Sequence, residues 1–215
     1  MTIETKICGI NSTEALSATI EGGAELVGFN FYRKSPRFLT HEAAAALART
    51  VPRPIIRVGL IVDFDNEAIA SLLAAVPLDM LQLHGLEDPA RVAAIRARFR
   101  KPVMKAIPIA RAEDLAAADD YLAVADRLLF DAKPPASMKD ALPGGNALSF
   151  DWRLLQGRQW SKPWMLSGGL TVENLADAVA ISGARRVDLA SGVEDRPGVK
   201  SPAKIKALLA LAKTL

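Results

Sequence analysis

The sequence contains one cysteine, Cys8, and a lysine, Lys6, lies two residues before it. A free thiol has a pKa of about 8.5, and a neighbouring ammonium group increases the fraction that is ionised at neutral pH. If this segment is a strand, Lys6 and Cys8 share one face, while Thr5 and Ile7 share the other. The pair therefore predicts a reactive thiol beside a cation, whereas a cysteine considered alone is more often a small buried hydrophobe.

Asp131 is the second residue suited to chemistry, because it ends the apolar run 128–130. An unpaired carboxylate at the edge of a core is costly. Partial burial raises the pKa of such a carboxyl group and allows it to act as a general acid. The same position also suits a helix cap or an ionic partner of Lys133 or Lys105, and the residue alone does not decide between these interpretations.

Short apolar runs alternate with alanine-rich segments of helical period along the chain, which is typical of a parallel sheet covered by helices. The expected strands cover residues 3–10, 26–31, 55–63, 80–85, 103–109, 128–133, 164–169 and 186–191. The expected helices cover residues 12–21, 42–49, 67–75, 89–99, 113–125, 172–182 and 202–212, with a brief helix at 151–155. A long loop, 134–149, precedes that brief helix, and a loop of this length usually has a function.

Eight strand-helix pairs in 215 residues predict an α/β fold with one domain, a (β/α)8 TIM barrel over residues 1–215. An open dinucleotide-binding sheet has a similar alternation, but no G-x-G-x-x-G turn follows the first expected strand. In a barrel the active site lies at the C-terminal ends of the strands. The candidate site residues at those ends are Cys8, Arg37, Gln82, His84, Asp131, Gly168, Gly169, Asp188, Ser191 and Gly192.

Glycines at the ends of the seventh and eighth expected strands predict a phosphate site. Gly168, Gly169, Ser191 and Gly192 lie where barrels often bind phosphate through backbone N–H groups. Glycine allows the backbone to approach an anion closely. The alternative is that these glycines only turn the chain.

Other polar side chains are candidates for binding the rest of a substrate. Arg37 is suited to bidentate contact with a carboxylate, or it is a solvated surface arginine. Gln82 and His84 share an inward face, where they either hydrogen-bond a substrate or pack at the rim. Asp188 is a further substrate-binding candidate. Two histidines, His41 and His84, form no metal-binding pattern, so no metal is expected.

Composition limits the partners and the setting. The formal net charge is +3 and the pI is about 9.1, with both signs of charge interspersed along the chain. This balance favours a small anionic substrate over nucleic acid. A single cysteine allows no internal disulfide, and neither a signal peptide nor an apolar run of membrane-spanning length is present. We expect a cytoplasmic protein with no membrane partner and no obligate protein partner.

Several motifs jointly resemble the phosphoribosylanthranilate isomerase family along nearly the whole chain. The motifs are Lys6-Ile7-Cys8-Gly9-Ile10, Gly28-Phe29, Ser35-Pro36-Arg37, Leu81-Gln82-Leu83-His84-Gly85, Phe150-Asp151-Trp152, Leu166-Ser167-Gly168-Gly169-Leu170, Val187-Asp188-Leu189-Ala190-Ser191-Gly192-Val193-Glu194 and Pro197-Gly198. The resemblance implies an Amadori rearrangement of N-(5-phosphoribosyl)anthranilate, an aminoaldose, into the corresponding aminoketose without a cofactor. It implies these roles: general acid for Asp131, general base for Cys8, carboxylate binding for Arg37, and phosphate binding for Gly169, Ser191 and Gly192.

Two positions depart from the family pattern. Ala147 stands where the family usually has glycine; if the position requires a positive φ, alanine costs roughly 1 kcal/mol there, and the loop would be shaped differently. Ala190 stands where the family commonly has serine, so a hydroxyl contact is expected to be missing.

Three rival functions remain to be weighed. A histidine-pathway barrel isomerase resembles this chain but uses aspartate where Cys8 stands. A barrel that binds a phosphorylated ligand without reaction would not need both Cys8 and Asp131. Nucleic-acid binding, the third rival, is disfavoured because the sequence contains no stripe of basic and aromatic residues.

Overall fold

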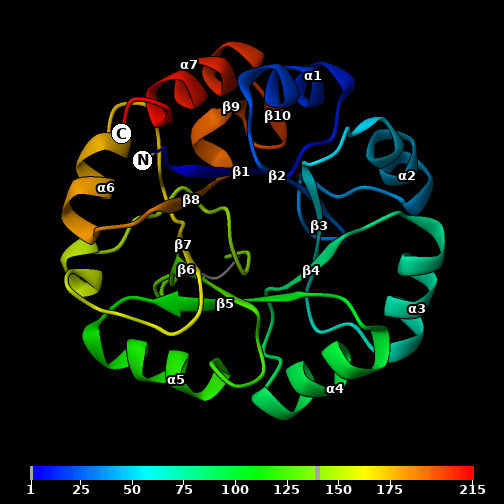
Figure 1. Ribbon diagram of the computed structural model, residues 1–215, viewed down its shortest axis with the longest axis horizontal. Helices are drawn as coiled ribbons and strands as arrows, with labels where there is room; N and C mark the ends of the chain where they lie inside the picture. Colours follow the sequence, from blue (N-terminus) through cyan, green and yellow to red (C-terminus); the bar gives the residue numbers. More distant parts are fainter. Residues whose placement is uncertain (1, 139–140) are drawn as a thin grey trace.

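Over residues 2–138 and 141–215, the computed structural model forms a closed barrel of eight parallel strands in sequence order (Figure 1). The strands are β1 Glu4–Cys8, β2 Leu26–Asn30, β3 Ile56–Ile61, β4 Met80–Leu83, β5 Val103–Ile109, β6 Arg127–Ala132, β7 Trp164–Leu166 and β8 Arg186–Leu189. Strand β8 pairs with β1 and closes the barrel, with Lys6 opposite Asp188. The predicted (β/α)8 barrel is confirmed.

Helices surround the barrel on its outside (Figure 1). They are α1 Thr13–Gly22, α2 His41–Thr50, α3 Asn66–Ala75, α4 Pro89–Phe99, α5 Ala117–Tyr121, α6 Leu175–Ser182 and α7 Pro202–Ala212, with 3-10 helices η1 Ala112–Ala116, η2 Trp152–Leu155 and η3 Ser191–Val193. The first four begin after a residue whose side-chain oxygen accepts a backbone N–H of the first turn: Ser12, Thr40, Asp65 and Asp88. Such caps satisfy N–H groups that have no partner within the helix.

Two apolar layers stabilise the fold. Strand residues point alternately into the barrel and toward the helices. The inner layer consists of Leu26, Val58, Met80, Met104, Ala106, Leu129 and Met165. The outer layer packs the other strand face against the helices and includes Ile7, Val27 and Phe29. Because both faces are buried, the strands are visible in the sequence as nearly continuous apolar runs.

Several strands are shorter than expected, β7 for example ending at Leu166, and three larger differences concern the helices and an added hairpin. The helix expected at 113–125 is η1 followed by α5, and the Asp114 carboxylate fixes the start of η1 by accepting the N–H groups of Ala110 and Arg111. Helix α6 begins later than residue 172 because Asn174 Oδ1 accepts the Thr171 N–H in a turn before the helix. After β8, β9 Glu194–Arg196 and β10 Val199–Lys200 form a short antiparallel hairpin that was not expected.

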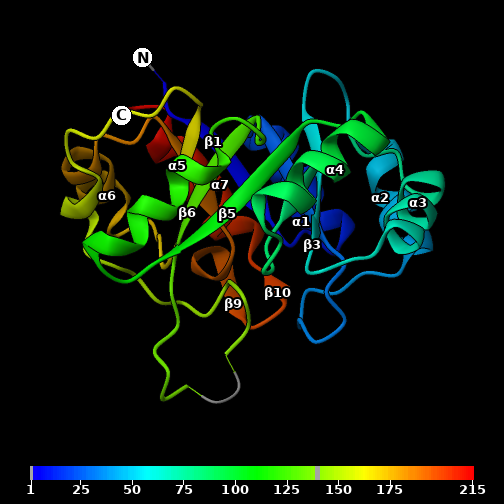
Figure 2. The same ribbon diagram turned by 90° about the horizontal axis from the view of Figure 1, so that it is seen from below.

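Figure 2 shows both termini at one end of the barrel, while the β9–β10 hairpin and the loop after β6 project at the other end. The loop and the hairpin both follow the C-terminal ends of strands, so the candidate site residues gather at that end. Among the described residues, no helix is long and apolar enough to cross a membrane.

Candidate active site

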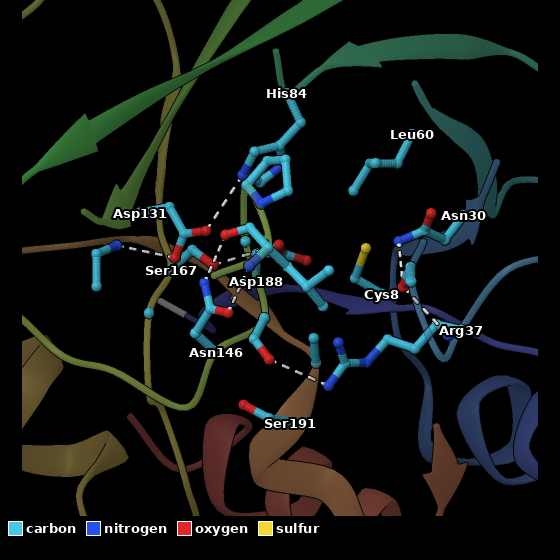
Figure 3. Close-up of a pocket in the computed structure, with 18 of the residues that line it drawn as sticks. Cys8, Asn30, Arg37, Leu60, His84, Asp131, Asn146, Ser167, Asp188 and Ser191 are labelled. Atoms are coloured by element: carbon cyan, nitrogen blue, oxygen red, sulfur yellow. Dashed lines mark hydrogen bonds and ion pairs between the residues drawn. The ribbon is translucent and has the colours of Figure 1, made fainter. Parts of the chain in front are cut away.

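A pocket lies at the C-terminal ends of the strands, and Figure 3 shows side chains from several strands pointing into it. The predicted site residues that line it are Cys8, Arg37, Gln82, His84, Asp131, Gly168, Gly169, Asp188 and Ser191. Gly192 is not among the lining residues of the described chain. The barrel therefore brings the expected acid and base to one cavity.

Part of the pocket wall was not anticipated from the sequence. Leu60, Val62 and Ser167 line the pocket at the C-terminal ends of β3 and β7. Their place at strand ends could have identified them as candidate site residues from the sequence. Residues 142–148, within the loop after β6, also line the pocket. The length of that loop predicted a function without saying which residues would contact the site.

Cys8 ends β1 and lines the pocket, with 4 % of its surface exposed. Lys6 lies deeper in the barrel and is fully buried, as strand alternation predicted. Its Nζ forms an ion pair with Asp188 Oδ1 at 2.8 Å, and Ser167 Oγ donates a longer hydrogen bond of 3.4 Å to Asp188 Oδ2. The charge of Lys6 therefore acts on both Asp188 and Cys8.

Burial raises the pKa of the Cys8 thiol above its ordinary value. The Lys6 ammonium lowers this pKa, as expected, but Asp188 raises it and the net shift is upward. Lys6 thus acts in the expected direction, but desolvation of the thiolate outweighs its effect, so the pKa of Cys8 lies above the ordinary thiol value. For Lys6 itself, burial lowers the pKa, but the attraction of Asp188 and Cys8 leaves the pKa raised.

Asp131 lies near the end of β6 with its carboxyl group buried against the pocket wall. Its Oδ1 accepts the Ala132 N–H at 2.9 Å, and its Oδ2 lies 3.2 Å from His84 Nε2. The other ring nitrogen, His84 Nδ1, lies 2.9 Å from Gln82 Nε2. His84 therefore connects the expected acid to strand β4.

The lysine-partner interpretation of Asp131 is wrong. Lys133 pairs with Asp114, and Lys105 pairs with Glu87. Among residues 2–138 and 141–215, no group of three or more His, Cys, Asp or Glu side chains is arranged to hold a metal ion.

Two glycines bring the loop after β6 onto the pocket residues. A Cβ on Gly144 would lie 2.6 Å from His84 Nε2 and 2.7 Å from Asp131 Oδ2. A Cβ on Gly145 would lie 2.5 Å from Arg37 Nη1. Only residues without a side chain allow so close an approach, which makes these glycines part of the site.

The two departures from the family pattern both lie at this pocket. Ala147 has a φ of +57°, so the position does adopt the left-handed conformation, and alanine accepts it at a cost of roughly 1 kcal/mol. Ala190 lines the pocket without a hydroxyl group, and its carbonyl accepts a hydrogen bond from Lys200 Nζ at 2.8 Å.

Arg37 is buried, so the interpretation of a solvated surface arginine is wrong. Its Nε and Nη2 donate to Glu194 Oε1 and Oε2 at 2.7 and 2.8 Å. Nη2 also donates to Gly145 O at 3.2 Å. The bidentate contact expected for a substrate carboxylate is therefore made with Glu194, and Nη1 is left for a ligand, since it donates to no residue in the described chain.

The glycines at the ends of β7 and β8 occupy conformations or spaces that a side chain would disturb. Gly168 and Gly169 have φ angles of +90° and +63°. A Cβ on Gly192 would lie 1.8 Å from Leu170 O, so glycine is required there for packing. Ser191, the residue before it, lines the pocket. These two strand ends therefore come together around one backbone-lined corner of the pocket.

Comparisons with known proteins show the family to which the chain is similar. A family model described as N-(5'phosphoribosyl)anthranilate (PRA) isomerase matches residues 5–210. The N-(5'-phosphoribosyl)anthranilate isomerase of Rhodospirillum centenum is 55 % identical over 100 % of both chains. The one from Paramagnetospirillum magneticum is 53 % identical over 99 % of this chain and 98 % of its own.

Solved structures of the same family share the fold. The crystal structure of phosphoribosyl anthranilate isomerase from Thermotoga maritima has a TM-score of 0.87 and 34 % identity, and it covers 99 % of this chain and 100 % of that one. A crystal structure of the enzyme in complex with reduced 1-(o-carboxyphenylamino)-1-deoxyribulose 5-phosphate has a TM-score of 0.82 and 32 % identity, with coverage of 99 % and 100 %. This chain belongs to the phosphoribosylanthranilate isomerase family and is an isomerase.

Proposed function

We propose that this chain converts N-(5-phosphoribosyl)anthranilate into 1-(2-carboxyphenylamino)-1-deoxyribulose 5-phosphate by an Amadori rearrangement in tryptophan biosynthesis. The observation that carries the proposal is that Cys8 and Asp131 line one pocket, beside the glycine-rich ends of β7 and β8. Relatives named for this activity, and a related structure that holds the reduced aminoketose phosphate, support the substrate class. The proposed reaction uses no cofactor.

Asp131 is the proposed general acid. Its carboxyl group donates a proton to the ring oxygen of the phosphoribosyl group, the C1′–O bond breaks, and the lone pair of the amine nitrogen forms a C=N bond. His84 Nε2, 3.2 Å from Asp131 Oδ2, supports the orientation of that carboxyl group. The product of this step is an open-chain, cationic Schiff base.

Cys8 is the proposed general base. A C–H bond next to a cationic imine is acidic enough for a modest base. The thiolate takes the C2′ proton, and the electron pair of that bond moves toward the nitrogen to give an enolamine. The enolamine then takes a proton at C1′ from the Cys8 thiol and gives the proton of its O2′ hydroxyl to the Asp131 carboxylate, which yields the ketone and regenerates the thiolate and the carboxylic acid.

The charged ends of the substrate match different walls of the pocket. Arg37 Nη1 is proposed to bind the anthranilate carboxylate, since the other edge of the guanidinium is held by Glu194. The strand ends at Gly168, Gly169, Ser191 and Gly192 are proposed to bind the phosphate through backbone N–H groups. The remaining proposed substrate contacts are Gln82, His84 and Asp188.

Turnover of freshly generated N-(5-phosphoribosyl)anthranilate tests the proposal. We expect the fluorescence of the substrate to disappear in proportion to enzyme concentration, with the aminoketose formed in equal amount by chromatography. Absence of turnover at high enzyme concentration would contradict the proposal and favour a barrel that only binds its ligand. Turnover confined to the aminoaldose of histidine biosynthesis would favour the rival isomerase.

A further inference from the structure

A buried group of three charged side chains lies behind the pocket wall, formed by Arg37, Glu194 and Lys200. Glu194 Oε1 accepts hydrogen bonds from both Arg37 Nε and Lys200 Nζ, each at 2.7 Å. Glu194 Oε2 accepts from Arg37 Nη2 at 2.8 Å and from the Gly198 N–H at 3.3 Å. At least 96 % of each of the three side chains is removed from solvent. The carboxylate of Glu194 is therefore fully used inside the protein.

Lys200 does not line the pocket, but it contacts the segment after β8 that is proposed to bind the phosphate. Its Nζ donates to Glu194 and also to Ala190 O, at 2.8 Å, directly before Ser191. Burial lowers the pKa of Lys200, while the Glu194 carboxylate opposes that shift and favours the charged form. Its charge is among the causes that lower the pKa of Cys8, but the lysine transfers no proton in the proposed mechanism.

The charge of the group explains what Lys200 adds. Without Lys200, the charges of Arg37 and Glu194 would cancel. A substrate carboxylate that binds Arg37 would then be repelled by the Glu194 carboxylate on the same guanidinium. With Lys200 protonated, the group carries two positive charges and one negative charge. An excess positive charge in a buried setting acts strongly on a carboxylate that enters the pocket.

The geometry of Arg37 explains what Glu194 adds. The Glu194 carboxylate accepts hydrogen bonds from Arg37 Nε and Nη2, and Gly145 O accepts a further hydrogen bond from Nη2. The guanidinium is planar and rigid, so these contacts fix the direction of Nη1. Nη1 lies against Gly145 of the pocket loop, where a Cβ would come within 2.5 Å of it.

We propose that Glu194 and Lys200 are positioning residues that make Arg37 selective for a carboxylate on the aromatic ring of the substrate. Glu194 sets the direction of Nη1, and Lys200 supplies the charge that allows a second carboxylate to bind the same guanidinium. The inference rests on the proposed function and specifies how its carboxylate end is recognised.

The test compares two substrates that differ only in this carboxylate: the glycosylamine formed from ribose 5-phosphate and anthranilate, and the one formed from ribose 5-phosphate and aniline. Lys200→Met removes the charge with little change in volume, and Lys200→Gln removes the charge but keeps a hydrogen-bond donor. For both variants we expect the ratio of kcat/KM between the anthranilate and aniline substrates to fall about tenfold, mainly through KM for the anthranilate substrate. Lys200→Arg, which restores the charge, is expected to restore most of the ratio.

Lys105→Met is the matched control. Lys105 is also a buried lysine, paired with Glu87 at 2.8 Å, and it does not line this pocket. Its loss is expected to change kcat/KM for both substrates by the same factor. An equal change for both substrates in the Lys200 variants, or no change, would overturn the inference. Wild-type protein that turns over neither substrate would overturn the proposed function, and this inference with it.

Discussion

Cys8 has surroundings that oppose its ionisation in the free protein, because burial and Asp188 raise the pKa of its thiol. The proposed intermediate changes this balance, since a cationic Schiff base would form in the same pocket and a nearby positive charge favours a thiolate. The raised pKa favours the protonated thiol in the free protein, and in the proposed mechanism the cationic intermediate favours its ionisation. A protonated thiol is also less reactive toward oxidants than a thiolate.

Direct titration of the single cysteine tests this account of Cys8. A raised pKa means that the thiolate forms only as the pH rises above the ordinary thiol value of about 8.5, so little thiolate is expected at neutral pH. The measurement is the ultraviolet absorbance of the thiolate against pH in the ligand-free protein, with Cys8→Ala subtracted to remove tyrosine ionisation. A thiolate that is fully formed at neutral pH would show that Lys6 outweighs burial.

The individual site residues could be predicted only where a local rule placed them. The two-residue period of a strand was sufficient to put Lys6 and Cys8 inside the barrel, as observed. The contact between Arg37 and Glu194 joins residues 157 positions apart, and no local pattern encodes such a pairing. For the same reason the ion pair between Lys6 and Asp188 could not be predicted from the sequence, because it forms only when β8 closes onto β1.

At the scale of elements, the strands and most helices could be predicted because each has a strong local signal. Parallel strands buried on both faces are nearly continuous apolar runs, and helices begin at side-chain caps such as Ser12 and Asp88. The β9–β10 hairpin lacks both signals. Its strands have only three and two residues, and their position depends on buried contacts of Glu194 and Lys200 rather than on an apolar pattern.

The loop after β6 brings Gly144 close to Asp131, the proposed acid, and Gly144→Ala tests the role of this loop. The added Cβ would lie 2.6 Å from His84 Nε2 and 2.7 Å from Asp131 Oδ2, so either the loop or these side chains must move. We expect kcat to fall roughly tenfold or more, because small displacements of catalytic groups are costly. Steady-state kinetics and thermal unfolding are the measurements.

Gly157→Ala is the control for that substitution, since no atom lies within 4 Å of a Cβ built there. Its positive φ of +70° predicts a loss of roughly 1 kcal/mol in stability with kcat retained. If Gly144→Ala kept the wild-type kcat, the loop would not be part of the catalytic arrangement.

At the scale of the whole molecule, ion pairs at one end of the barrel join strands whose other ends carry groups proposed to do chemistry. Near the N-terminal ends of the strands, Glu4 of β1 pairs with Arg127 of β6 and Arg186 of β8. At the opposite end, Cys8 of β1 and Asp131 of β6 line one pocket (Figure 3). The proposed acid and the proposed base come from strands far apart in the sequence, so they line one pocket only when the barrel is closed.

The most direct test of the account is kcat/KM for N-(5-phosphoribosyl)anthranilate in Cys8→Ala and Asp131→Asn, measured beside the wild-type protein. Each change removes one proton-transfer group and leaves the barrel contacts in place, so each is expected to lower kcat/KM about a thousandfold with unchanged circular dichroism. If Cys8→Ala retained a rate near that of the wild type, the assignment of Cys8 as the general base would be wrong.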